Sequence, residues 1–332
     1  GIIFGRNMDF DHKKRQQFLT EEYYIETKIE LKDTIVDYLS EPNNDDNSTI
    51  EEGWEDSYFL ASQSMFNLFV LEYTAGCPLE VLRNNLDDLV TIFEIYSKKL
   101  RLFKKDKNEP AFDIHTFDGY YPYLSLISLC YLLHRKDLLS RVALLVDGAN
   151  KKNAGEDWLI EEFLAFNEKK RYKCEDVLLP IPYFELSKAF VTDDNSISLS
   201  HLTNFLKNWY KDLASALWHD THIEQAGYYG YWSFEAATTV ILLGIDDDSS
   251  LYEYLYYPKD LVQFAKEFVP SADDISLSKK EHLRCEAGQI CPKKGEWYSP
   301  ANDMEKQHFN QGEVMPEIAN NPWGLTIWYM TE

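Results

Sequence analysis

Residues 225–251 read QAGYYGYWSFEAATTVILLGIDDDSSL, a stretch that joins an aromatic cluster to an apolar run. Ahead of the aspartates its only charged side chain is Glu235, so residues 233–243 predict a helix that is apolar nearly all round and lies inside a larger body. Gly244 follows this run, and glycine most readily adopts the left-handed backbone that ends a helix. The stretch therefore predicts a buried helix with a sharp end.

The residues after Gly244 predict an acidic connection. Asp246, Asp247 and Asp248 come directly after the helix stop, where we expect them to be exposed and without a neutralising cation. The pattern Ser250-Leu-Tyr-Glu253 is typical of a capping box, in which the serine and glutamate satisfy free backbone donors. This pattern predicts that a new helix begins there.

The carboxylate of Glu235 needs a partner or a raised pKa, because burial penalises its charged form. Donors from the same stretch, such as Tyr228, Tyr231 or Trp232, would make it a satisfied polar node of the core. A general acid with a raised pKa is the alternative for this residue. We favour the structural role. We also expect structural roles for Gly227, Gly230, Trp232 and Gly244.

The rest of the chain is predicted to be overwhelmingly helical. Apolar residues recur at helical spacing in several segments, which glycines, prolines and charged runs separate. The further predicted helices span residues 18–39, 57–75, 79–103, 123–133, 138–147, 158–166, 183–190, 199–219 and 258–268.

The last fifty residues differ from the rest of the chain in composition. They are rich in Gly, Pro and Asn and hold short β-prone runs at 295–298 and 325–329, behind a polar linker predicted at 271–280. We therefore predict a mainly all-α protein, an irregular multi-helix bundle with a small C-terminal β-containing appendage. The predicted domains are an N-terminal helical domain at 1–175, a C-terminal helical domain at 176–270 that carries GYYGYWSFEAA, and a tail module at 281–332.

Composition limits the class of protein. The chain has 332 residues, of which 45% are hydrophobic, so it can bury a large core. The longest uncharged segment, residues 119–133, is too short for a membrane span, and no signal-peptide pattern begins the sequence. The five cysteines are an odd number and indicate no disulfide framework, so a reducing cytoplasm fits best.

The net charge of −23 is distributed unevenly along the chain. Residues 33–82 and 212–258 contain acids but neither Lys nor Arg. Such regions repel nucleic acid and attract basic surfaces, so direct nucleic-acid binding is not expected. The basic runs at 13–15 and 169–171 are short and are interpreted as helix surface. Solvated faces that keep the protein soluble are the alternative explanation for the acids.

Two clusters of candidate ligands could serve catalysis or metal binding. His219, His222 and Glu224 lie close in sequence, but the His-x-x-His spacing matches no zinc-protease motif, so caps at a helix end are the favoured interpretation. His282, Cys285, Cys291 and His308 could hold a structural zinc, although isolated thiols fit their spacing better. We expect no cofactor and no enzyme activity.

The segment 226–251, followed by the sequence YYPKDL at 256–261, resembles the C-terminal signature of the PoNi family of bacterial immunity proteins. The helical first half, including YLSLISLC at 123–130 and EDWLI at 156–160, resembles the N-terminal domain of the same family more loosely. The tail is similar to a C-terminal module of other toxin-immunity proteins of interbacterial competition systems, through the sequences CP at 291–292, GEW at 295–297, GEVMP at 312–316 and GLTIW at 324–328.

The resemblance implies a cytoplasmic protein that binds a cognate nuclease effector, typically of the PD-(D/E)xK type delivered by a type VI or related secretion system. A nuclease presents a basic cleft to phosphates, so a rigid acidic partner can occupy that cleft, with aromatic anchors adding specificity. Residues expected on this face are Asp45, Asp46, Glu51, Glu52, Glu55, Asp56, Tyr228, Tyr229, Asp246, Asp247 and Asp248.

Two other classes of protein remain compatible with the sequence. One is a metal-dependent enzyme that uses His219, His222 and Glu224. The other is a structural or adaptor protein, and a homodimer is also compatible with the sequence. Whether an inhibitor of this kind would block the active site of the toxin or bind elsewhere on it is left open.

Overall fold

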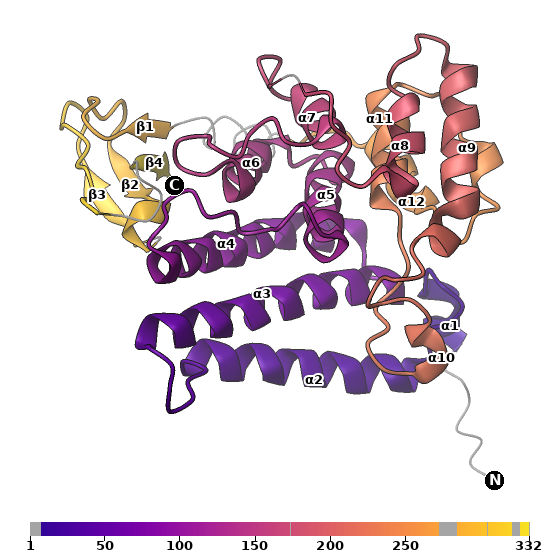
Figure 1. Cartoon of the computed structure of the whole chain (residues 1–332), viewed down its shortest axis with the longest axis horizontal. Helices are drawn as coiled ribbons and strands as arrows, with labels where there is room; N and C mark the ends of the chain where they lie inside the picture. Colours follow the sequence, from indigo (N-terminus) through magenta and orange to yellow (C-terminus); the bar gives the residue numbers. More distant parts are fainter. Residues whose placement is uncertain (1–7, 173, 272–283, 304, 321–325, 332) are drawn as a thin grey trace.

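The computed structural model describes residues 8–172, 174–271, 284–303, 305–320 and 326–331 (Figure 1). The helices are α1 Met8–Lys13, α2 Glu21–Ser40, α3 Ile50–Ala75, α4 Leu79–Lys104, α5 Phe117–Leu132, α6 Leu139–Asp147, α7 Trp158–Ala165, α8 Pro180–Lys188, α9 Asn195–Asp212, α10 Thr221–Glu224, α11 Phe234–Leu242 and α12 Lys259–Glu267. The strands are β1 Arg284–Glu286, β2 Gly295–Tyr298, β3 Gln307–Phe309 and β4 Ile327–Met330. The predicted mainly helical class with a small β-containing tail is confirmed.

The three long helices α2, α3 and α4 form one side of the molecule and lie roughly alongside one another (Figure 1). Thr20 and Thr49 cap the first two of these helices, because their side chains accept from the backbone N–H groups of Tyr23 and Glu52. α3 ends at Gly76, whose φ of 101° is left-handed and whose N–H turns back to the last turn of the helix. These local signals account for starting α3 at Ile50, seven residues before the predicted start.

α5 is the centre of the helical body, because most of its residues are buried on every side. α6, α7, α11 and α12 pack against it. One continuous hydrophobic core runs from Phe10 to Ala265 and takes residues from both predicted helical domains. The division of the helices at residue 175 stays a prediction.

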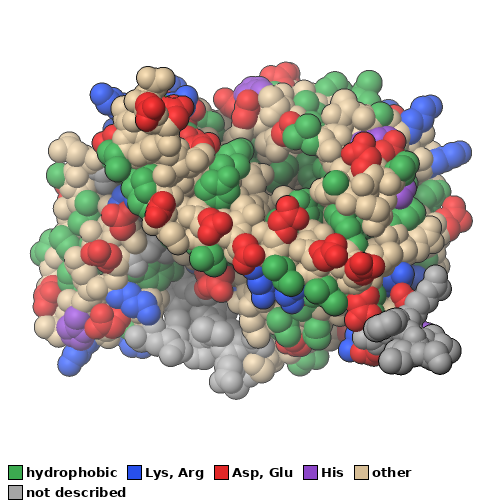
Figure 2. All heavy atoms as spheres, turned by 90° about the horizontal axis from the view of Figure 1, so that it is seen from below, with side chains coloured by type: hydrophobic (Ala, Val, Ile, Leu, Met, Phe, Trp, Pro, Cys, Tyr) green, Lys and Arg blue, Asp and Glu red, His purple; other side chains and the backbone are tan. Residues whose placement is uncertain are grey.

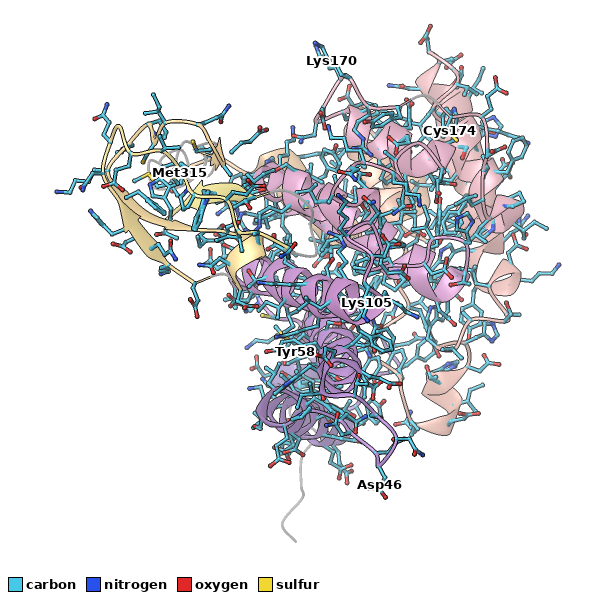
Figure 3. The ribbon with its side chains drawn as sticks, turned by 60° about the vertical axis from the view of Figure 1, so that its left-hand side comes forward. Asp46, Tyr58, Lys105, Lys170, Cys174 and Met315 are labelled. Atoms are coloured by element: carbon cyan, nitrogen blue, oxygen red, sulfur yellow. The ribbon has the colours of Figure 1, made fainter. Side chains whose placement is uncertain are left out.

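The tail builds its own small core around an antiparallel sheet in the strand order β1-β4-β2-β3. Trp297 and Trp328 are fully buried there, and Met315 lies within the module (Figure 3). The module contacts α4 through Lys98, whose Nζ lies 3.0 Å from the carbonyl oxygen of Ala301 and 3.1 Å from the carboxylate of Asp303. The predicted linker at 271–280 falls, from residue 272 onward, outside the described residues.

Two predicted helices are wrong in part. The helix expected over residues 199–219 ends at Asp212, and the chain then turns before the short α10. The capping box expected at residues 250–253 starts no α-helix, because only a three-residue 3₁₀ turn forms at Ser249–Leu251. The side chain of Asp247 accepts a hydrogen bond from the backbone N–H of Ser249 at 3.0 Å, and this bond fixes a tight turn at this position.

Candidate functional site

Glu235 on α11 is completely buried, as the sequence predicted. One carboxylate oxygen accepts from Trp209 Nε1 at 3.0 Å and from Ser233 Oγ at 2.9 Å. The other oxygen has no hydrogen-bond partner among the residues that the structure describes. Burial raises the pKa of Glu235 to about 7. The predicted donors were wrong, because the indole comes from α9 and only the fold brings it to the carboxylate.

Aromatic residues of the same stretch form hydrogen bonds with other side chains of the protein and not with Glu235. Trp232 Nε1 donates to Thr74 Oγ1 at 2.9 Å, and Tyr228 Oη donates to Gln16 Oε1 at 2.6 Å. Tyr228 was expected to contact a partner protein, but it is completely buried and not exposed at the surface of this structure. Tyr229, its neighbour, is partly exposed.

The glycines of the stretch allow close packing and sharp turns. Gly230 has a φ of 129°, and a Cβ there would come within 2.1 Å of Thr74 Oγ1, the atom that holds Trp232. Gly227 also has a left-handed φ, of 73°. Gly244 ends α11 with a φ of 65°, and the N–H of Ile245 reaches back to Val240 O at 3.0 Å, so the predicted helix stop is confirmed.

The three aspartates after α11 differ from one another. Asp246 and Asp247 are exposed as expected, but Asp248 is buried. Tyr257 Oη donates to Asp248 at 2.6 Å, Tyr252 Oη donates to it at 3.2 Å, and Lys266 Nζ lies 3.6 Å away. The expectation that all three are exposed and lack a cation is therefore wrong for Asp248, because Lys266 of α12 lies beside its carboxylate.

The acids at 41–56 gather at the turn between α2 and α3. Asp45, Asp46 and Glu51 are exposed, whereas Glu52, Glu55 and Asp56 are partly buried. Asp46 points away from the body of the molecule (Figure 3). Tyr96 Oη lies 3.5 Å from Glu55, and burial raises the pKa of that carboxylate.

The two predicted acidic groups do not share one surface. The α2–α3 turn is at one end of the long helices, whereas α11 and α12, which flank Asp246, lie at the opposite end of the molecule (Figure 1). A single partner face that includes both would have to span the protein. The acidic residues at the α2–α3 turn are instead followed by further exposed acidic residues along α2.

The outer face of α2 was missed by sequence reasoning. Ile25, Ile29 and Val36 are 48%, 56% and 63% exposed and lie in one stripe at helical spacing. A parallel stripe of exposed acids runs beside it, formed by Glu22, Glu26, Glu30, Asp33 and Asp37. Figure 2 looks onto this side and shows a row of carboxylates with apolar side chains beside it.

The two lysines of α2 leave most of this charge uncompensated. Lys28 binds Glu72 of α3 at 3.1 Å, and Lys32 is exposed near the apolar stripe. Helical spacing predicted the helix, but it does not say which apolar residues face inward. The clustering of five acids on one side of the helical wheel is the signal that could have identified this face.

The candidate metal ligands have other contacts. The ring of His219 stacks on Tyr210, and His222 Nδ1 lies 2.6 Å from Tyr231 Oη. His308 is exposed and lies 3.0 Å from Glu296, while His282 is outside the described residues. Over the described ranges, no three His, Cys, Asp or Glu side chains are grouped to hold a metal ion.

The two basic runs are not simple helix surface. Arg15 binds the carboxylate of Asp260 on α12. Arg171 is almost fully buried and makes paired contacts with Asp147 and Glu161 at 2.7 to 3.0 Å. Both arginines fix distant segments of the body, so their charge is not available to a partner.

The fold is similar to that of a protein of known structure. The crystal structure of protein PA2201 from Pseudomonas aeruginosa is similar, with a TM-score of 0.61 and 18% identity over 79% of this chain and 94% of that chain. At this identity the likeness concerns the fold alone. No curated protein matches the sequence. None of the helices in the described part of the chain combines the length and apolar composition that a membrane span needs.

Part of the sequence matches a known protein family. Residues 155–261 match the family described as PoNe immunity proteins (PoNi), C-terminal. This range contains α7 to α11, the buried Glu235 and the glycines that shape the stretch at 225–251. Residues 155–261 are therefore similar to the C-terminal domain of the PoNe immunity proteins (PoNi).

Proposed function

We propose that this protein binds a cognate secreted nuclease toxin and neutralises it, acting as an inhibitor and not as an enzyme. The family match at residues 155–261 carries the proposal. The partner would be delivered by a type VI or related secretion system, and the immunity protein would meet it in the cytoplasm. The helical body would act as a rigid support for the surface that contacts the toxin.

The electrostatics of the α2 side support an acidic mode of capture. Five exposed acids lie on one face of α2, and Asp45, Asp46 and Glu51 extend that charge beyond its end. A basic cleft that binds phosphates would be attracted to such a surface, which raises association rates by about 10- to 1000-fold in steered complexes. The exposed isoleucines and valine beside the acids add apolar area that a specific interface needs.

The exposure of each side chain in the structure changes the set of residues proposed to contact the toxin. Asp45, Asp46, Glu51, Glu52, Glu55, Asp56, Tyr229, Asp246 and Asp247 remain candidates. Tyr228 and Asp248 leave the set because both are buried. Glu22, Glu26, Glu30, Asp33 and Asp37 of α2 enter it.

Co-expression with the nuclease toxin whose gene is expected beside this one is the direct test. The expected result is that the protein restores growth, co-purifies with the toxin and inhibits its cleavage of DNA in a purified assay. A protein that restores no growth and retains no toxin on an affinity column would contradict the proposal. Metal analysis and light scattering of the purified protein would then separate a metal enzyme from a self-associating scaffold.

A further inference from the structure

A pocket of about 490 Å³ lies where three separate segments of the chain meet. It is lined by residues of α3 between 63 and 70, by the first turns of α5, and by the stretch 217–230. These segments belong to the regions 33–82, 108–134 and 212–258, none of which contains a lysine or an arginine. The fold therefore gathers three cation-free regions around one opening.

The lining combines aromatic rings with carboxylates. Phe117, Tyr121, Trp218 and Tyr229 supply the rings, while Asp118 and Glu224 are exposed acids that also line the pocket. No basic side chain is among the lining residues. Rings with acids beside them are the surroundings that bind an ammonium or guanidinium group, through cation–π contact and charge pairing.

One further feature points to an occupant from outside. Leu217, a lining residue, is 80% exposed, which is unusual for a large apolar side chain next to a pocket. Contact with a partner would remove this apolar surface from water.

We propose that this pocket receives a lysine or arginine side chain from the protein partner. The carboxylates of Asp118 and Glu224 face its charge, and the aromatic rings cover its aliphatic stem. An acidic or purely apolar side chain would leave these two carboxylates repelled or desolvated without a counter-charge. The identity of the partner as a nuclease toxin rests on the function proposed above.

The pocket gives a surface role to part of the family signature. Gly227, Tyr229 and Gly230 line it, although the neighbouring Tyr228 and Trp232 are buried in the core. The signature therefore has two sides: one holds the fold together, and the other presents an opening. This site lies on a different part of the molecule from the acidic turn at Asp46 (Figures 1 and 3).

A charge reversal at the pocket, compared with the same reversal at a distance, tests the proposal. Glu224→Lys is expected to weaken binding to a catalytically inactive cognate toxin by about thirtyfold, mainly through faster dissociation, since it breaks a close charge pair. Asp46→Lys makes the same change of charge at the α2–α3 turn and should weaken binding by less than about threefold, mainly through association. Equal effects of the two substitutions would overturn the proposal.

A crosslinking experiment identifies the occupant and does not depend on the stability of a variant. A photoreactive amino acid in place of the exposed Leu217 should crosslink to a toxin peptide with a lysine or arginine within two residues of the modified position. Reversing that basic residue to glutamate should restore the binding of Glu224→Lys. A crosslink to a segment without a basic residue, or to a second copy of this chain, would overturn the proposal.

The outcomes separate the two proposals. If the unaltered protein does not bind the toxin, the proposed function fails and the pocket assignment fails with it. If the unaltered protein binds and Glu224→Lys binds equally well, only the pocket assignment fails.

Discussion

Several acidic side chains inside the helical body are paired with arginines, whereas those along α2 face solvent with few cations beside them. Asp147 and Glu161 share Arg171, and Glu94 binds Arg141. On α2 the five exposed acids are accompanied by one exposed lysine, Lys32. The same residue type therefore stabilises the fold in one region and leaves an unbalanced field in the other.

Solvation explains the difference. A buried carboxylate loses its water and must be paired or protonated, whereas an exposed carboxylate keeps its water and needs no partner. Glu235 is an intermediate case, because it is buried without a cation and burial raises its pKa to about 7. Charge that is not required for folding remains available for binding.

The largest effect is expected at the buried pairs. Arg171→Met keeps the length of the side chain but leaves Asp147 and Glu161 buried without a cation, so unfolding free energy should fall by about 3 to 5 kcal/mol. Urea unfolding measures this change. Lys170→Met, the exposed neighbour, is the matched control and should change stability by less than about 0.5 kcal/mol. A loss below about 1 kcal/mol for Arg171→Met would remove the distinction between the two regions.

The next effect concerns Glu235 and depends on pH. Its pKa is raised in the folded state, so the folded protein binds an extra proton between about pH 4.5 and 7, and stability falls as pH rises through that range. Glu235→Gln removes this dependence and should be more stable than the unaltered protein by up to about 3 kcal/mol at pH 8, with little difference near pH 4.5.

Unfolding curves at pH 5 and pH 8 test the prediction for Glu235. Glu224→Gln changes an exposed glutamate of a neighbouring segment and should show the same pH dependence as the unaltered protein. A constant difference between Glu235→Gln and the unaltered protein across this range would mean that the buried carboxyl group keeps an ordinary pKa.

A smaller effect is expected on the α2 face, and it should appear in binding and not in stability. The combination of Glu26→Gln, Glu30→Gln and Asp33→Asn should slow association with the toxin by about tenfold at low salt, and by less at 0.15 M salt. Glu168→Gln, Glu175→Gln and Asp193→Asn make the same change of charge away from α2 and serve as the control. Stopped-flow association rates measure both. Equal rates for the two triple variants would show that only total charge matters.

The smallest effect is expected at the connection after α11. Asp246→Asn combined with Asp247→Asn should slow association by about twofold at low salt, since only two exposed charges are lost. Asp248 is left unchanged because it accepts from two tyrosines in the fold. An unchanged association rate at low salt would exclude Asp246 and Asp247 from steering.

Local signals in the sequence determined much of this protein. The helical class, the position of α11, its stop at Gly244 and the β-containing tail all depend on spacing, caps and turn residues that lie close together in the chain. The signature around residues 225–251 also indicated the family. Such features can be predicted because each is fixed by interactions within a few residues.

Contacts between distant segments decided the rest. Trp209 reaches Glu235, Lys266 reaches Asp248, and Arg171 reaches Asp147, although nothing in the spacing of these residues links them. The same is true of the exposed stripe on α2 and of the pocket between α3, α5 and residues 217–230. Burial is a property of the packed chain: the sequence showed which regions lack cations, and only the tertiary structure decided which carboxylates are paired inside and which are left for a partner.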